Sequence, residues 1–385
     1  MNIRFARECD KNDIMEIWNY CFNDGPKFTE YYFENKYKNY NTILVEEETS
    51  VVSSLQLNQY EILLNGKKYD TSYIVGVSTL PQARGRGYMK YIMNFTLNEL
   101  YRKNQLVSIL MPIDYRLYRK YGYEHCYDQI EYEINIEDLS GFKSCGSLLK
   151  ANLDYVDKMM DIEKCFLKNL NGIVIRDRNY YENLFKEVES EDGHIYIHKN
   201  EEYDGYIIYF INGDNIFVRE LYYNNINALK NMLKFIYNHN TQCKTVNITS
   251  PLDDKIRFIL SNPKTSNIKI KPFMMGRVIN LKKYLESLYI SSNENISLVI
   301  SVKDDYIEEN NKIFEINLEN NKLTVKEVNC DYDVEFDINT ISQLAFSYIN
   351  GREACLLNNM GENEKVINFL DTVFIKKENY INEYI

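Results

Sequence analysis

The sequence predicts an α+β fold in three successive domains, each with a mostly antiparallel sheet flanked by helices. Three observations support this prediction. The chain has 385 residues, which is too long for one ordinary domain. A strand, a glycine-rich turn and a helix follow several strand-like segments, and a looser version of this order comes after residue 140. From about residue 291 the pattern changes to short alternating strands and one helix.

The first domain is predicted over residues 1–140. Apolar residues recur at helical spacing at 14–21, after the acidic Asp10 and Asp13, and at 88–100 after the glycine-rich turn. A third, short helix is expected at 116–121. Strands are expected at 3–6, 42–46, 50–60, 68–79, 106–111 and 129–136.

The second domain is predicted over residues 141–287 and the third over residues 288–385. In the second, helices are expected at 154–170, 179–188 and 228–237, and strands at 194–198, 206–211, 216–223, 245–248 and 273–280. In the third, strands are expected at 296–302, 312–318, 322–328 and 334–338, followed by a helix at 341–349 that Gly351 ends.

The composition of the chain limits the classes of binding partner and the cellular compartment that can be expected. The 45 basic and 56 acidic residues give a net charge of −11, which argues against nucleic acid or an anionic membrane surface as the main partner and favours cationic substrates. Eight cysteines occur without a C-x-x-C pair, and neither a hydrophobic signal core nor a membrane-spanning run is found. We therefore expect a cytoplasmic protein without structural disulfides.

The turn after the fourth strand is the most informative segment. It is made of Gln82, Ala83, Arg84, Gly85, Arg86 and Gly87. A strand that ends in such a turn before a helix leaves several backbone N–H groups unpaired at the positive end of the helix dipole. The segment is therefore expected to bind a pyrophosphate.

This turn resembles the pyrophosphate loop of the GCN5-related N-acetyltransferases, which reads Q/R-x-x-G-x-G/A. Gln82, Gly85 and Gly87 match the motif in full. A second motif of that family, Y-x-x-x-G-F/Y, matches Tyr118, Gly122 and Tyr123. Because both motifs occur in the family's order and spacing, the first domain is identified as an acetyltransferase domain.

The whole chain resembles the enhanced intracellular survival (Eis) family, in which two acetyltransferase-like domains precede a sterol-carrier-protein-like domain. The resemblance implies acetyl-CoA-dependent transfer to a primary amine, either of a cationic small molecule such as an aminoglycoside or polyamine, or of lysine. It also implies a homo-oligomer, a trimer or a hexamer. Which amine is accepted cannot be read from the sequence.

The resemblance assigns roles to particular residues. The strand backbone at Val75, Val77 and Thr79 is expected to pair with pantetheine, and residues 82–87 to hold the pyrophosphate. Arg84 and Arg86 either add charge to the phosphates or are solvated loop residues. Tyr118 is the expected general acid, since a phenol of pKa about 10 can protonate a thiolate whose conjugate acid has a pKa of about 8.5. The alternative is that Tyr118 is one core aromatic among 34 tyrosines.

The family also implies a base and an amine pocket. Its C-terminal carboxylate enters the active site, and here that group belongs to Ile385; alternatively, the tail only closes the third domain. Asp24, Trp18, Phe28 and Glu383 are expected to line the amine pocket. A turn at the end of a helix is the alternative role for Asp24.

Two features are interpreted as non-catalytic. The second domain's corresponding turn, residues 223–227, has no glycine, so this domain is expected to wall the substrate pocket rather than bind cofactor. His194 and His198 alternate on one strand face without a third ligand, and no metal site is expected. A non-enzymatic scaffold that binds acetyl-CoA or a lipid remains the alternative to an enzyme, and a protein acetyltransferase is a third possibility.

Overall fold

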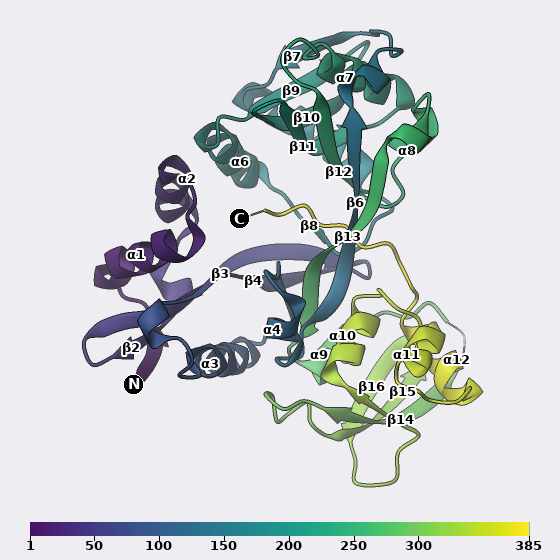
Figure 1. The fold of residues 1–385 in the computed structure, drawn as a ribbon. Helices are drawn as coiled ribbons and strands as arrows, with labels where there is room; N and C mark the ends of the chain where they lie inside the picture. The colour runs from purple at the N-terminus through teal and green to yellow at the C-terminus, as the bar shows by residue number, and fades with distance from the viewer. Residues whose placement is uncertain (293, 385) are drawn as a thin grey trace.

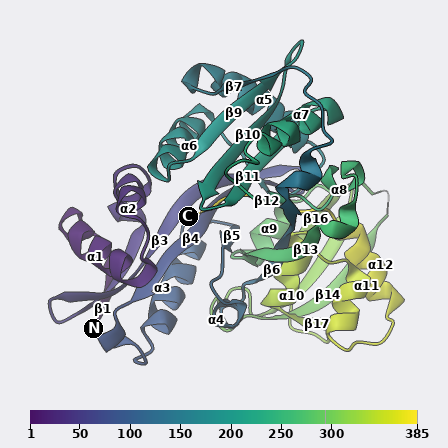
Figure 2. The ribbon, with the colours of Figure 1, turned by 45° about the horizontal axis from the view of Figure 1, so that its top comes forward.

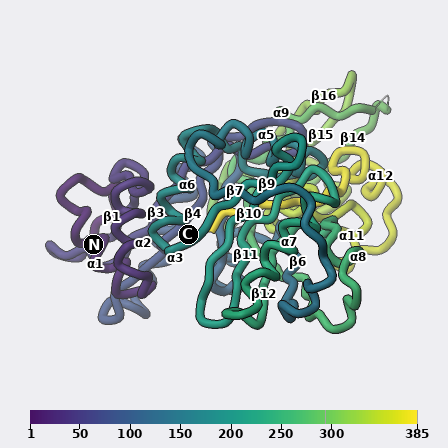
Figure 3. Tube along the Cα trace, turned by 90° about the horizontal axis from the view of Figure 1, so that it is seen from above, coloured from purple at the N-terminus to yellow at the C-terminus, as the bar shows by residue number. Residues whose placement is uncertain are grey.

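The computed structural model describes residues 1–292 and 294–384 and arranges them in three lobes. In Figure 1 the first lobe is purple to blue, the second teal to green, and the third light green to yellow. The last residues leave the third lobe and run back between the other two, and this tail lies near strand β4 (Lys67–Thr79) in Figures 2 and 3. No helix among the described residues is both long and apolar enough to cross a bilayer.

The first lobe has helices on both faces of its strands. Ile14, Ile17 and Trp18, at helical spacing, bury one side of α1 against one face of the sheet, whereas Ile92 and Leu97 bury α3 against the other. The strands are β1 (Asn2–Phe5), β2 (Thr42–Glu47), β3 (Ser50–Leu64), β4 (Lys67–Thr79) and β5 (Val107–Leu110), and the helices are α1 (Lys11–Phe22), α2 (Pro26–Tyr31), α3 (Tyr88–Arg102) and α4 (Tyr115–Arg119).

The second lobe repeats this layering. Helices α5 and α6 pack on one face of its strands and α7 on the other, each through an apolar stripe. The strands are β6 (Glu124–Asn135), β7 (Ser147–Lys150), β8 (Ile173–Val174), β9 (His194–Lys199), β10 (Tyr203–Asn212), β11 (Asn215–Tyr223), β12 (Thr245–Ser250) and β13 (Asn267–Val278). The helices are α5 (Val156–Phe166), α6 (Arg178–Ser190), α7 (Ile226–Tyr237) and α8 (Ile256–Ile259).

One continuous sheet joins these two lobes. Its order is β1-β2-β3-β4-β5-β13-β6-β12-β11-β10-β9-β7, with β8 paired to β3. Strand β13, from the end of the second predicted domain, lies between β5 and β6, with Met275 opposite Leu110 and Ile270 opposite Ile130. This insertion, which was not predicted from the sequence, fixes the two lobes to one another by backbone hydrogen bonds.

The third lobe is a four-stranded sheet, β16-β15-β14-β17, covered by helices. Its elements are α9 (Leu281–Ser287), β14 (Ile296–Lys303), β15 (Ile313–Glu319), β16 (Lys322–Glu327), β17 (Val334–Asp337), α10 (Ile338–Ala345), α11 (Gly351–Leu357) and α12 (Glu364–Val373). The prediction that Gly351 ends a helix is wrong. Gly351 begins α11 instead, because the side chains of Asn350 and Glu353 form a capping box around the start of that helix.

Candidate active site

The turn between β4 and α3 has the geometry of an anion-binding loop. Gly85 and Gly87 adopt φ values of +77° and +82°, which glycine tolerates best. A Cβ on Gly85 would meet nothing within 4 Å, so the backbone there faces open space. Among the described residues, no side chain caps α3 at Gly87. The first N–H groups of α3 are therefore available to an anion.

The equivalent turn of the second lobe differs in this respect. The side-chain oxygen of Asn225 accepts a hydrogen bond from the backbone N–H of Ala228 at 2.9 Å and so caps α7. A capped helix start has fewer free donors for a phosphate. The two turns therefore differ at their helix starts, and the absence of cofactor binding at the second turn stays a prediction.

The two arginines of the first turn are both engaged at its exposed rim. The Nε of Arg84 donates to the backbone oxygen of Thr79 at 3.1 Å, and Arg86 pairs with Glu47 at 2.9 Å. Gln82 is also exposed, whereas Ala83 is buried against α3. The backbone of the turn, rather than these side chains, is thus the feature most directly organised for an anion.

A slot opens between β4 and β5. The two strands pair in parallel only from Thr71 opposite Val107 to Ile74 opposite Leu110. Beyond that point β4 continues through residues 75–79, and none of the described strands pairs with that edge. At its start, Gly76 has a φ of +59° and the register with β3 shifts, which is a bulge. The backbone of Val77 and Thr79 therefore lies on an edge without a strand partner among the described residues, where only the Thr79 oxygen is already bound, by Arg84.

Tyr118 lies on α4, which follows β5. Its side chain is 5% exposed and packs in one apolar cluster with Ile74, Leu110 and Met275. Burial raises the pKa of Tyr118 to about 12, and the described residues offer its hydroxyl no hydrogen-bond partner. The phenol is therefore neutral at physiological pH and has its proton available for transfer.

A polar wall lies on the other face of β4. The indole Nε1 of Trp18 donates to Asp24 at 2.9 Å, and its ring stacks on Tyr32 at 4.5 Å. A Cβ on Gly76 would lie 2.0 Å from Oε1 of Gln56 and 2.4 Å from the Trp18 ring, so both side chains fill the space over the bulge. Gln56 is 2% exposed, and neither its oxygen nor its nitrogen has a partner among the described residues. A buried amide without a partner suits a site that binds a polar ligand.

The tail is held in place through its backbone and its polar side chains. Gln129 on β6 donates to the backbone oxygen of Ile381, and Asn382 donates to the backbone oxygen of Arg219 on β11. The hydroxyl of Tyr73 on β4 donates to the backbone oxygen of Glu383 at 3.3 Å. The tail therefore docks across the joint between the first two lobes. Ile385, the predicted base, lies outside the described residues.

Glu383 belongs to a buried charged cluster. Arg176, from the second lobe, contacts Glu383 at 2.9 Å, Glu220 at 2.8 Å and Glu163 at 3.2 Å. The hydroxyl of Tyr180 also donates to Glu383, at 2.5 Å. Burial raises the pKa of Glu163 to about 7, which relieves the excess of carboxylates around one guanidinium. Arg176 thus anchors the tail by charge.

Family models match all three lobes. Acetyltransferase (GNAT) domain models match residues 2–126 and 172–278, and a sterol carrier protein domain model matches residues 281–382. The protein is an N-acetyltransferase with two GNAT domains and a sterol carrier protein domain. A comparison with curated protein sequences gave no match.

Solved structures share the fold of this acetyltransferase over its whole length. A probable N-acyltransferase from Enterococcus faecalis V583 is 22% identical, with a TM-score of 0.87 over 100% of this chain and 99% of that chain. A GCN5-related N-acetyltransferase from Anabaena variabilis is 20% identical, with a TM-score of 0.86 and 100% of both chains covered. Eis1 from Mycobacterium abscessus is 14% identical, with a TM-score of 0.76 and 100% of both chains covered.

Of the four residues predicted to line the amine pocket, three lie together in the first lobe, and Glu383 is bound elsewhere. Trp18 and Asp24 contact one another beside the β4 bulge, and Phe28 packs near Tyr32 with their ring centroids 6.5 Å apart. Glu383 is not free to meet a substrate directly, because Arg176 and Tyr180 bind it. Neither Gln56 nor Arg176 was predicted, since each gains its role from contacts between distant segments.

His194 and His198, which were interpreted as structural residues, lie on β9. His198 is buried and its Nδ1 lies 2.5 Å from Asp204, while its Nε2 lies 2.8 Å from the backbone oxygen of Cys145. These contacts are those of a structural histidine. Within residues 1–292 and 294–384, no group of three or more His, Cys, Asp or Glu side chains is arranged to hold a metal ion.

Proposed function

We propose that this acetyltransferase binds acetyl-CoA along β4 and the β4–α3 turn and transfers the acetyl group directly to a primary amine, either of a cationic small molecule or of lysine. The observation that carries the proposal is the uncapped, glycine-lined start of α3, continuous with the unpaired edge of β4. The free N–H groups at the start of α3 suit a pyrophosphate, and the unpaired edge of β4 suits an amide-containing arm such as pantetheine. Tyr118 lies in the helix that follows β5, the other wall of the slot.

The chain's own residues supply the remaining chemistry. Acetyl-CoA contributes the thioester whose acetyl group moves to the amine nitrogen as the carbon–sulfur bond breaks. The departing sulfur needs a proton, and the neutral hydroxyl of Tyr118 is the proposed donor. The amine loses a proton on attack. The resemblance assigns its acceptor to the carboxylate of Ile385, and this assignment stays a prediction.

The acceptor side is acidic, which favours a cationic amine. Burial raises the pKa of Glu191 at the end of α6, and repulsion from Glu187 and Asp24 adds to this effect despite attraction to Arg219. Asp24 of the first lobe and Glu187 and Glu191 of the second therefore repel one another, although Arg219 pairs with Glu187 at 2.9 Å and lies 3.9 Å from Glu191. A substrate with one or more ammonium groups would relieve that repulsion. The amide of Gln56, beside the bulge, is the proposed hydrogen-bond partner of the acceptor.

The test is acetyl-CoA-dependent release of free thiol by the full-length protein with no C-terminal tag. The panel contains aminoglycosides, polyamines and lysine peptides, with neutral alcohols of matched size as controls. We expect saturable release with at least one amine and none with the alcohols. Measurable acetyl-CoA binding without release for any amine would contradict the proposed acceptor class.

A further inference from the structure

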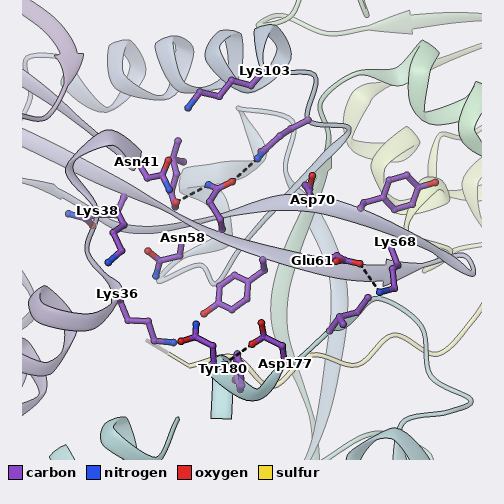
Figure 4. Close-up of a pocket in the computed structure, with 18 of the residues that line it drawn as sticks. Lys36, Lys38, Asn41, Asn58, Glu61, Lys68, Asp70, Lys103, Asp177 and Tyr180 are labelled. Carbon is purple, nitrogen blue, oxygen red and sulfur yellow. Dashed lines mark hydrogen bonds and ion pairs between the residues drawn. The ribbon is translucent and has the colours of Figure 1, made fainter. Parts of the chain in front are cut away.

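A large cavity lies along the outer edge of β3. Its volume is about 1000 Å³, and it is bordered by both GNAT lobes. Figure 4 shows Lys103 on one side of the strands and Lys36, Asp177 and Tyr180 on the other. Nine carboxamide side chains and four tyrosines are among the residues that line it. A cavity with this lining suits a polar ligand rather than an apolar one.

A gap in strand pairing runs along the cavity. On its outer edge, β3 pairs with β2 as far as Gln56 and with β8 from Ile62. Residues 57–60 between them have no strand on that side among the described residues, while β4 pairs with them on the other side. Four extended residues span about 13 Å. The gap is therefore long enough for a short extended segment to fill.

The backbone of Gln59 faces this gap. The backbone oxygens of Glu61 and Leu63 accept hydrogen bonds from the β8 segment, and alternate residues of a strand point their backbone groups the same way. The N–H and C=O of Gln59 are therefore directed outward and are not used by the ladder to β4. The Gln59 side chain donates to the backbone oxygen of Leu57 at 2.9 Å and so covers that acceptor.

The charge around the gap has the opposite sign to that of the whole protein. Five lysines and three acidic residues line the cavity, whereas the chain carries a net charge of −11. Lys36 and Lys68 have carboxylate partners, Glu187 and Glu61. Lys38 and Lys103 have none among the described residues, and they lie at the cavity's border. This excess of positive charge favours an acidic ligand.

We propose that this cavity binds an extended acidic peptide, which adds to the edge of β3 in the gap between β2 and β8. The peptide pairs with the backbone N–H and C=O of Gln59, and its acidic side chains approach Lys38 and Lys103. The cavity shares Gln56, the proposed partner of the acceptor, with the acetyl-transfer site, but the peptide itself contacts Gln59, Lys38 and Lys103. Peptide binding needs neither acetyl-CoA nor the slot between β4 and β5.

The test measures fluorescence anisotropy of a labelled, end-blocked hexapeptide of alternating aspartate and valine with the full chain. A peptide with the same side chains but N-methylated at alternate residues is the matched probe, because it keeps the charge and loses strand pairing. We expect saturable binding of the unmethylated peptide and at least tenfold weaker binding of the N-methylated peptide. A tenfold loss corresponds to the loss of one to two hydrogen bonds. Equal binding of both peptides would overturn the proposal, as would absence of binding.

Variants of Gln59 separate the backbone from the side chain. Gln59→Pro removes the outward N–H without touching the β4 ladder, and Gln59→Ala uncovers the Leu57 oxygen. Peptide binding is expected to fall at least tenfold in the first and to be kept or tightened in the second. If Gln59→Pro does not fold, the double variant Lys38→Glu, Lys103→Glu gives the second readout, with the acidic peptide weakened and a lysine–valine peptide favoured.

Two outcomes would assign the cavity to another occupant and refute the peptide. One is tighter binding of a galacturonic acid hexamer than of the aspartate–valine peptide, which would indicate a saccharide. The other is self-association by sedimentation equilibrium that Gln59→Pro abolishes and the peptide does not compete with, which would indicate a second copy of this chain.

Discussion

Replacing Tyr118 with phenylalanine should lower the rate of acetyl transfer without lowering the stability of the fold. Its hydroxyl has no hydrogen-bond partner among the described residues, so its removal leaves no partner orphaned and is expected to change the free energy of unfolding by less than about 1 kcal/mol. As proposed acid, however, the hydroxyl contributes about 10²- to 10⁴-fold to the rate, which is roughly 3 to 5 kcal/mol of barrier. A large loss of kcat with an unchanged melting temperature is therefore expected.

The assay is thiol release at saturating acetyl-CoA, with acetyl-CoA affinity measured separately by calorimetry. Tyr121→Phe is the matched control, since Tyr121 is also buried, has a hydroxyl without a partner among the described residues, and has a pKa raised to about 12 by burial. Tyr118→Phe should lose rate and keep affinity, while Tyr121→Phe should keep both. Because burial raises the pKa of Tyr118 to about 12, its ionisation should not limit the wild-type rate below about pH 11. Equal rates for wild type and Tyr118→Phe would refute the role.

Four further predictions concern the loop, the acceptor, the tail and the charged cluster. Gly85→Val should weaken acetyl-CoA binding at least tenfold, whereas Gly213→Val, at a similar positive φ with equally open space, should not. Gln56→Met should raise the acceptor KM about five- to thirtyfold, the effect of one or two hydrogen bonds, and leave the acetyl-CoA KM unchanged; equal changes in both would contradict its placement. Residues appended after Ile385 should abolish turnover but not acetyl-CoA binding, and full activity would remove the terminal carboxylate as base. Folding raises the pKa of Glu163 from 4.5 to about 7, so the unfolded chain releases this proton at a lower pH than the folded chain does. The free energy of unfolding therefore falls by up to about 3 kcal/mol as the pH rises from 4.5 to 7. Urea unfolding at pH 4.5 and pH 8 should show this fall in the wild type and not in Glu163→Gln.

The local parts of the site could be predicted from sequence because short segments dictate them. Gly85 and Gly87 need left-handed backbone, and an apolar stripe at helical spacing after them predicts α3. The same logic predicted most strands of all three lobes to within a few residues. The error at Gly351 arose because a glycine suits both the end of one helix and the capped start of the next, and only the Asn350 and Glu353 contacts decide between them.

The long-range parts could not be predicted in the same way. Strand β13 alternates like many strands, and nothing in its own residues shows that it inserts between β5 and β6. Gln56 resembles any polar strand residue until Gly76 and Trp18 enclose it. Arg176 is likewise an ordinary loop arginine until it meets carboxylates from three separate segments, Glu163, Glu220 and Glu383.

The inserted strand also ties the second GNAT lobe to the proposed site. β13 and β6 are shared by both halves of the sheet, so the second lobe cannot shift relative to β4 without breaking backbone ladders. The Arg176 guanidinium and the backbone oxygen of Arg219, both on that lobe, bind the tail at Glu383 and Asn382, and Tyr73 of β4 binds the same tail. The second lobe, in which Asn225 caps α7, thus positions the tail, and the shared sheet gives that position its rigidity.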